Sequence, residues 1–231
     1  MKKMIALLVA LMLLLMTASA FAETRITVTG TGEVRVSADI AMISLGVNAR
    51  DKDVLKAQQR VNETIAAIRT ALIGQGVKEE DINTDVINIY PLYDYSNDQE
   101  QLSAYNANST LAIKVTDMES VGSLIDVSFA AGANTLNGIS FSASDTKDAE
   151  ASSMKKAVEN AKEKAEVLAE AAGLKITGIE VISEGGVYNY SNTAGNGRAF
   201  DMVEDAEEAG TVVQAAKLIV SATVSITFDA E

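Results

Sequence analysis

The sequence predicts an α+β protein with an antiparallel sheet built on a split β-α-β-β-α-β unit, preceded by a β-hairpin and followed by a long alanine-rich helix and two further strands. The first observation is the apolar pattern between residues 39 and 142, which runs strand, helix, strand, strand, helix, strand. The second is a glycine-containing alternating run before that unit. The third is a long helical pattern after it. Helices on one face of an antiparallel sheet are the economical packing for this order.

Two alternating runs open the folded part of the chain, at Arg25–Val36 and Asp39–Ala49. The short break at Ser37–Asp39 predicts that they pair as a hairpin. Gly30 and Gly32 form a G-x-G, but no helix follows, as a phosphate-binding loop requires. The two glycines are therefore interpreted as a β-bulge or bend.

The next element is a helix that extends to about Ile73. Asp51 and Asp53 supply acidic capping at its start, and Gly74 and Gly76 end it. Apolar residues at three- and four-residue spacings define one face of this helix. They are Val54, Ala57, Val61, Ile65, Ile68 and Leu72.

A second hairpin is predicted from Asp85–Tyr93 and Tyr105–Val115, joined by a polar tip at Asp94–Ser103. A short helix at Met118–Ala131 and a strand at Asn134–Ser142 complete the split unit. Together with the strand at Asp39–Ala49 and the helix that follows it, these segments give two helices and four strands in one compact body.

The longest helix is predicted to begin after Asp145 and to reach about Ala172, with strands at Ile176–Ile182 and Leu218–Phe228 after it. Its stripe is mostly alanine, which lets a backbone approach closely. We expect this stripe to pack on the domain's own sheet rather than in a coiled coil. The predicted stripe consists of Ala151, Met154, Val158, Ala161, Ala165, Leu168 and Ala172.

Glu184–Gly210 is predicted to be a long, glycine-rich and acidic loop, and loops of this length are usually functional or disordered. Oxygen ligands in its acidic run suit calcium. The spacing does not match a calcium-binding loop, so a solvated surface is favoured and no metal site is predicted. The run contains Asp201, Glu204, Asp205, Glu207 and Glu208.

The first 22 residues have the pattern of an export signal. Lys2 and Lys3 precede the apolar run Met4–Met16, and Ala20-Phe21-Ala22 forms a cleavage site. Cleavage after Ala22 leaves a mature domain at 23–231 that is periplasmic or secreted. The alternative is an uncleaved membrane anchor; otherwise no stable membrane span is expected.

Histidine and cysteine are absent from the chain, which removes the usual neutral-pH bases, thiol nucleophiles and zinc ligands. Of 19 basic residues, Lys2 and Lys3 lie in the signal, so 17 face 32 acidic residues and the mature net charge is −15. Such a surface repels nucleic acid. No carboxylate has an apolar, aromatic-lined context that would raise its pKa. No catalytic residue and no cofactor is predicted.

The six tyrosines lie in two clusters near the predicted loops. Tyrosine suits protein interfaces and sugar-binding surfaces because its ring covers apolar area while its hydroxyl stays wet. Tyr90 and Tyr105 have an alternative role as cross-strand partners that close the hairpin. The candidate interaction surface comprises Tyr93, Tyr95, Tyr188 and Tyr190.

Four segments in order resemble the SIMPL-domain family, which includes bacterial periplasmic oxidative-stress-defence proteins and a periplasmic immunogenic protein. They are Ile26–Val34 (ITVTGTGEV), Tyr90–Tyr95 (YPLYDY), Gly132–Asn134 with Gly138–Phe141, and the alanine helix from Lys164 to Gly173. The resemblance covers about Arg25 to Phe228. Ala38 stands where the family usually has proline, and the segment 198–210 is acidic where the family has a proline-rich one.

The resemblance implies an α/β protein behind a signal peptide, without established catalytic residues. It also implies an association with oxidative-stress resistance and assembly into a homo-oligomer. We therefore expect an exported non-enzymatic protein that binds further copies of itself or other envelope proteins. The alternative is a calcium- or glycan-binding envelope module that uses the acidic loop and the tyrosine clusters.

Overall fold

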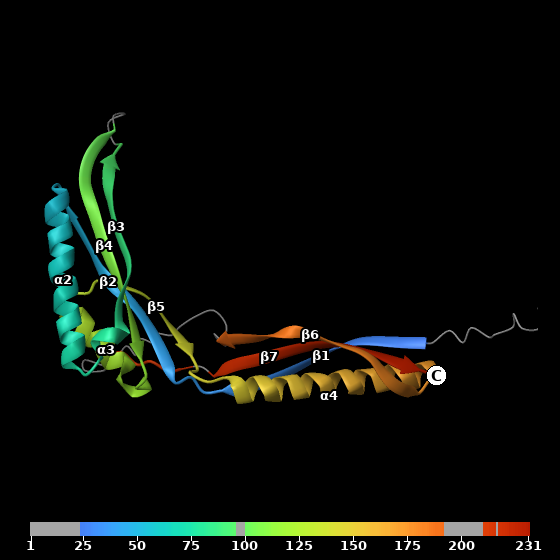
Figure 1. The fold of residues 1–231 in the computed structure, drawn as a ribbon. Coiled ribbons are helices and arrows are strands. Elements are labelled where there is room, and N and C mark those ends of the chain that lie inside the picture. The colour runs from blue at the N-terminus through green and yellow to red at the C-terminus, as the bar shows by residue number, and fades with distance from the viewer. Residues whose placement is uncertain (1–23, 96–99, 192–209, 216) are drawn as a thin grey trace, which may run out of the picture. The chain divides into compact units, whose positions relative to one another are not determined.

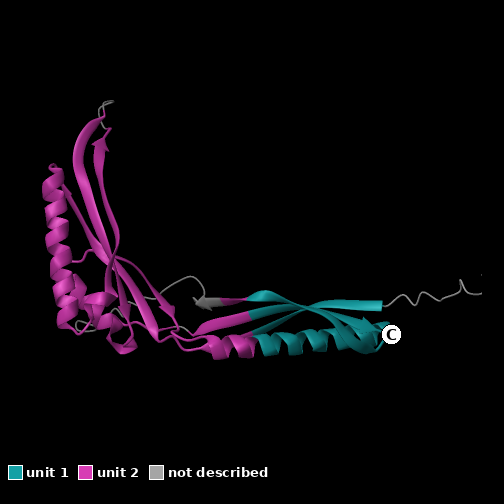
Figure 2. Ribbon diagram, viewed as in Figure 1, with its two compact units in different colours: residues 1–32, 154–186, 222–231 teal, residues 33–153, 187–221 magenta. Residues whose placement is uncertain are grey.

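The computed structural model describes residues 24–95, 100–191, 210–215 and 217–231. The predicted export signal and the acidic run at 201–208 lie outside these residues. The chain divides into two compact units, each assembled from several segments (Figure 2). Unit 1 contains residues up to 32, 154–186 and 222–231, and unit 2 contains residues 33–153 and 187–221. Both units consist of segments from the predicted domain at 23–231.

Unit 2 contains the predicted split unit. Within the described residues its sheet has four strands in the order β3-β4-β2-β5, and every neighbouring pair is antiparallel. The helices α2 and α3 lie on the same side of this sheet (Figure 1). The elements are β2 (Ile40–Asp51), α2 (Val54–Gly74), the short 3-10 helix η1 (Glu79–Asp81), β3 (Ile82–Asp94), β4 (Gln101–Val115), the 3-10 helix η2 (Met118–Ser120), α3 (Val121–Ala130) and β5 (Thr135–Ser142).

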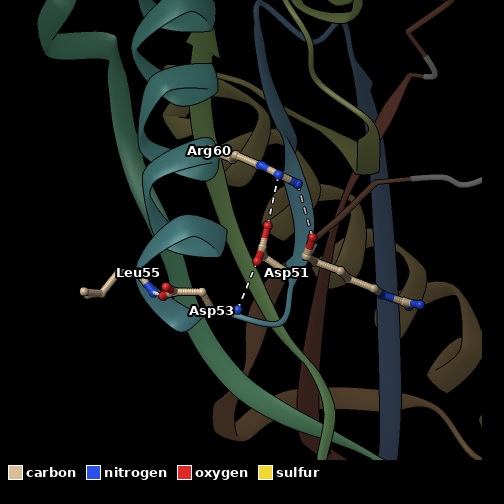
Figure 3. Close-up of polar contacts among 5 residues, drawn as sticks. Asp51, Asp53, Leu55 and Arg60 are labelled. Atoms are coloured by element: carbon tan, nitrogen blue, oxygen red, sulfur yellow. Dashed lines mark hydrogen bonds and ion pairs between the residues drawn. The ribbon is translucent and has the colours of Figure 1, made fainter.

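The start of α2 is held by the two aspartates that the sequence indicated (Figure 3). The Asp53 carboxylate accepts from the backbone N–H of Leu55 at 2.9 Å, and so satisfies one of the free donors at the helix start. Asp51 accepts from the Asp53 N–H at 3.0 Å and pairs with Arg60 Nη2 at 2.9 Å. These contacts fix α2 to the end of β2. Gly76, at φ 91°, terminates the helix in the conformation that favours glycine.

The core of unit 2 lies between the sheet and its two helices. On the sheet side, Ile43 faces Ile113 and Leu45 faces Leu111 across β2 and β4. Because α2 packs mainly on β2 and β4, β3 stays largely outside this core. The buried helix residues that meet the sheet are Ile68, Leu72, Val121, Leu124 and Ile125.

The predicted hairpin between the first two strands is wrong. β1 (Thr24–Val36) belongs to a separate three-stranded sheet with the order β1-β7-β6, whose other strands are β6 (Ile176–Ser191) and β7 (Leu218–Ala230). Thr27 and Thr227 mark the pairing of β1 with β7, since their hydroxyl oxygens are 3.0 Å apart. Neighbouring runs in the sequence suggested the hairpin, but both sides of β2 are occupied by β4 and β5.

The helix α4 (Lys147–Ala172) lies along the three-stranded sheet (Figure 1). Its predicted stripe is right at Ala161 and Ala165, which are buried, and wrong toward the C-terminal end, where Leu168 is half exposed and Ala172 is exposed. Residues spaced by four form a row that is inclined to the helix axis. Over a long helix such a row can follow the surface of a twisted sheet. The buried row is Ala149, Ser153, Ala157, Ala161, Ala165 and Ala169.

Gly30 explains why this row is made of small residues. A Cβ at Gly30 would lie 2.0 Å from the Ala157 carbonyl oxygen and 2.7 Å from the Ala161 Cβ. Backbone of β1 and backbone of α4 are therefore in direct contact at this point. Gly30, the first glycine of the G-x-G, is therefore required by the close approach of α4 to β1.

The predicted long loop starts later than expected, because β6 continues through Tyr188 to Ser191. At the other end of the loop, Thr211 docks on α3. The Asp126 carboxylate accepts from the Thr211 N–H at 3.0 Å and from its hydroxyl at 2.5 Å. Gly122 makes room for this contact, since a Cβ there would lie 1.9 Å from the Thr211 carbonyl oxygen.

Candidate interaction surfaces

The register of the β3–β4 hairpin separates the two tyrosines that were considered as partners. Tyr90 lies opposite Asn106, and Tyr105 lies opposite Pro91. Successive residues of a strand point to opposite faces. Tyr90 and Tyr105 are therefore on different faces of the sheet, and the prediction that they form a cross-strand pair is wrong.

Tyr93 and Tyr95 lie at the distal end of β3, next to the hairpin tip. Tyr93 is 45% exposed and Tyr95 is 66% exposed. The Tyr95 hydroxyl is 3.4 Å from a Glu100 carboxylate oxygen across the tip. Both rings are therefore open to a partner, as an interaction surface requires.

The second predicted tyrosine pair belongs to a different sheet. Tyr188 is on β6 in the three-stranded sheet and is half exposed. Tyr190 is also on β6, but its side chain lies outside the described residues. The structure thus brings Tyr93 and Tyr95 together at one hairpin and leaves Tyr188 on another strand.

Sequence reasoning missed a larger exposed surface on the same hairpin. Apart from its first residue and one half-buried leucine, every residue of β3 is exposed. The run V-I-N-I-Y-P-L has apolar residues on both faces, which in a central strand indicates burial on both sides. Pro91 indicated an edge strand rather than a central one, because proline has no N–H to donate to a neighbouring strand. The exposed apolar residues of this hairpin surface are Val86, Ile87, Ile89, Tyr90, Tyr93 and Leu102.

The open face of the four-stranded sheet carries a row of amides. Asn108 on β4 lies opposite Asn48 on β2 and Asn88 on β3. In the next row, Asn106 is fully buried, and its Oδ1 accepts from Arg50 Nε at 3.2 Å. Among the described residues, the Asn106 Nδ2 has no hydrogen-bond partner. This face is polar and rich in hydrogen-bonding groups.

A shallow groove of about 490 Å³ lies in unit 1 between β1 and α4. Lys164 crosses it and donates from Nζ to the Thr29 carbonyl oxygen at 2.8 Å. Exposed Val167 and Leu168 give the groove apolar walls. It is too open to exclude water from a reacting group.

Among the described residues, two carboxyl groups have shifted pKa values, and both shifts are downward. The hydroxyl and then the backbone N–H of Ser144 hold the pKa of Asp39 below its ordinary value of 3.8. The Asp53 N–H and the charge of Arg60 lower the pKa of Asp51. A general acid that works near neutral pH needs the opposite shift, from burial in an apolar pocket.

The Asp39 contact makes stability depend on pH. Ser144 bonds the charged carboxylate, so this contribution is fully present above about pH 3.8 and is lost as the pH falls through the lower folded pKa. We expect Asp39→Asn to lower the melting temperature more at pH 7 than at pH 2. Circular dichroism melts at both pH values measure this. An equal loss at both would show that the charge is irrelevant.

Within the described residues, no three acidic side chains converge to hold a metal ion. The predicted acidic run at 201–208 lies outside those residues. In the part of the chain that the structure describes, no helix combines the length and the apolar character needed to cross a membrane.

Comparison with known proteins gives one family and several bacterial relatives. A family model described as SIMPL, protein of unknown function (DUF541), matches residues 26–228. The 26 kDa periplasmic immunogenic protein of Brucella melitensis biotype 1 is 31% identical over 165 residues, which cover 69% of this chain and 66% of that protein. The uncharacterized protein YggE of Escherichia coli K12 is 27% identical over 144 residues, covering 62% of this chain and 58% of that protein. The matched part of the chain thus spans 66% of the Brucella protein and 58% of the Escherichia coli protein.

Proposed function

The chain belongs to the SIMPL family, and from that premise we propose that it is an exported, non-enzymatic protein that assembles with further copies of itself and supports defence of the envelope against oxidative stress. The single observation that carries the assembly part is the hairpin surface. Six large apolar side chains are exposed along β3 and the start of β4. Large exposed apolar residues that gather on one hairpin indicate an interaction site.

The composition supports a non-enzymatic role. Without histidine and cysteine, only carboxylates, lysines and tyrosines could move protons or form covalent intermediates. The two carboxyl groups with shifted pKa values, Asp39 and Asp51, are shifted away from neutrality. We therefore propose that the chain acts mainly by binding other molecules through its surface.

The export signal and the relatives support an envelope location. The Brucella proteins are named periplasmic. Lys2, Lys3 and the apolar run Met4–Met16 form the signal that would direct this chain out of the cytoplasm, with cleavage after Ala22.

Protection against oxidants would be indirect. The family resemblance supplies the link to oxidative stress, but the mature chain has no thiol to be oxidised reversibly. Its methionines are Met42, Met118, Met154 and Met202, too few for an efficient scavenger. We propose that the assembly protects through the components that it binds.

The native mass of the mature chain tests the assembly part. Size-exclusion chromatography with light scattering, at protein concentrations from about 1 to 100 µM, should give a mass that is a multiple of one chain. A single-chain mass at every concentration would contradict self-assembly. Variants of Ile87 and Ile89 to lysine should shift the mass toward one chain, because charge on an edge strand opposes pairing.

A further inference from the structure

We propose that β3 is the assembly contact, and that its open edge pairs antiparallel with β3 of a second copy around Asn88. The inference rests on the proposed self-assembly and names the surface responsible for it. Within the described residues, β4 is the only sheet neighbour of β3. The other edge therefore presents free backbone N–H and C=O groups along a strand of 13 residues.

Natural edge strands are usually protected by charge, by shortness or by covering elements. β3 has none of these between Val86 and Tyr93, a stretch without a single charged residue. Pro91 removes one N–H, which confines regular pairing to the segment on its N-terminal side. The bulge between Thr84 and Val86 limits pairing at the other end. Residues 86–90 remain as the pairing segment.

This segment is self-complementary about its central residue. A twofold axis at Asn88 sets Ile87 of one copy opposite Ile89 of the other on the helix side of the sheet. On the open side it sets Val86 opposite Tyr90, a β-branched residue against an aromatic one, which is a favourable cross-strand pair. Asn88 then meets its own copy. In the single chain, each of the four apolar side chains of this segment is at least 38% exposed.

The charge of the chain favours this edge over other surfaces. Two copies, each with a net charge of −15 after signal removal, repel one another over most of their surface. The uncharged segment 86–90 is a place where the copies can approach without opposing carboxylates. A twofold contact is also the commonest symmetry of homo-oligomers.

The opposite edge of the sheet is less suited. β5 has 8 residues, and a register shift falls opposite Ser44 and Leu45. Gly138, at φ 150°, lies at this irregularity. The exposed residues of β5 are polar, as at Asn137 and Ser140, so burial there would gain little.

The absence of cysteine from the chain allows a direct test by single-cysteine cross-linking. In the proposed pair, the two copies of residue 88 have Cα atoms about 4.5–5.5 Å apart, within the range that a disulfide spans. Mild oxidation of Asn88→Cys in the otherwise unchanged mature chain should give a covalent dimer on a non-reducing gel. Ser140→Cys on the β5 edge is the matched control, and it should give at least tenfold less dimer.

A second pair of variants fixes the register. Ile87→Cys and Ile89→Cys, one with a size tag, should form the mixed disulfide when they are combined, and little disulfide when each is oxidised alone. Light scattering on the unmodified chain distinguishes a failure of the β3 contact from a failure of self-assembly itself. A multimer whose Asn88→Cys dimer does not exceed the Ser140→Cys control would overturn the β3 contact and leave self-assembly standing. A monomer throughout would overturn both.

Discussion

Replacing Gly30 by alanine is expected to destabilise unit 1 by about 2–3 kcal/mol, because overpacking of a tight contact has this size. The added Cβ would lie 2.0 Å from the Ala157 carbonyl oxygen and 2.7 Å from the Ala161 Cβ. Both neighbours belong to the helix α4, one as backbone and one as a side chain without rotamers, so neither can swing away. The strand and helix must separate, and the apolar contacts along the alanine row weaken with them.

Urea unfolding followed by circular dichroism measures this loss, and hydrogen exchange assigns it to β1, β7 and α4. Gly74→Ala is the matched control, since nothing lies within 4 Å of a Cβ at that position, the last residue of α2. It should stabilise slightly, by up to about 1 kcal/mol, through a less flexible unfolded chain. Equal effects of the two substitutions would show that Gly30 is not a close-contact position.

Leu111→Ala is expected to destabilise unit 2 by about 3 kcal/mol, through lost burial and the cavity that remains. Leu111 is fully buried between β2 and the helices, opposite Leu45. Leu102→Ala on the same strand is the matched control, because Leu102 is 48% exposed. The control should change the free energy of unfolding by less than about 0.5 kcal/mol. Similar losses at both positions would contradict the placement of the core.

The sequence predicted the split unit well because its signals are local. Asp51 and Asp53 at the start of α2, and Gly76 after its end, act within one turn of the helix that they define. The antiparallel pairing of β3 with β4 follows from a short polar tip between two apolar runs. Such features need no knowledge of distant residues.

The pairing of β1 with β7 could not be predicted in this way. Thr27 and Thr227 are two hundred positions apart, and they become neighbours only in the three-stranded sheet. The alanine row was misplaced for a related reason. Its four-residue spacing depends on the twist of the sheet that it covers, and that sheet joins both ends of the mature chain.

The candidate surface was predicted in part. Tyr93 and Tyr95 were found from the chemistry of tyrosine near a turn, and the structure leaves both exposed. Ile87 and Ile89 were missed, because aliphatic residues in a strand ordinarily indicate core. Their exposure follows from the strand order, which places β3 at the edge and α2 over its neighbours. Tertiary position decides the role of such residues.

The central proposal is that the exported chain acts by contact between copies of itself. Chemical cross-linking of the mature protein in intact cells tests this claim most directly, because the protein is then in its own compartment at its own concentration. The account predicts a series of bands at multiples of the single-chain mass, reduced when Ile87 and Ile89 are both replaced by lysine. A single-chain band alone, or bands that contain only other proteins, would contradict it.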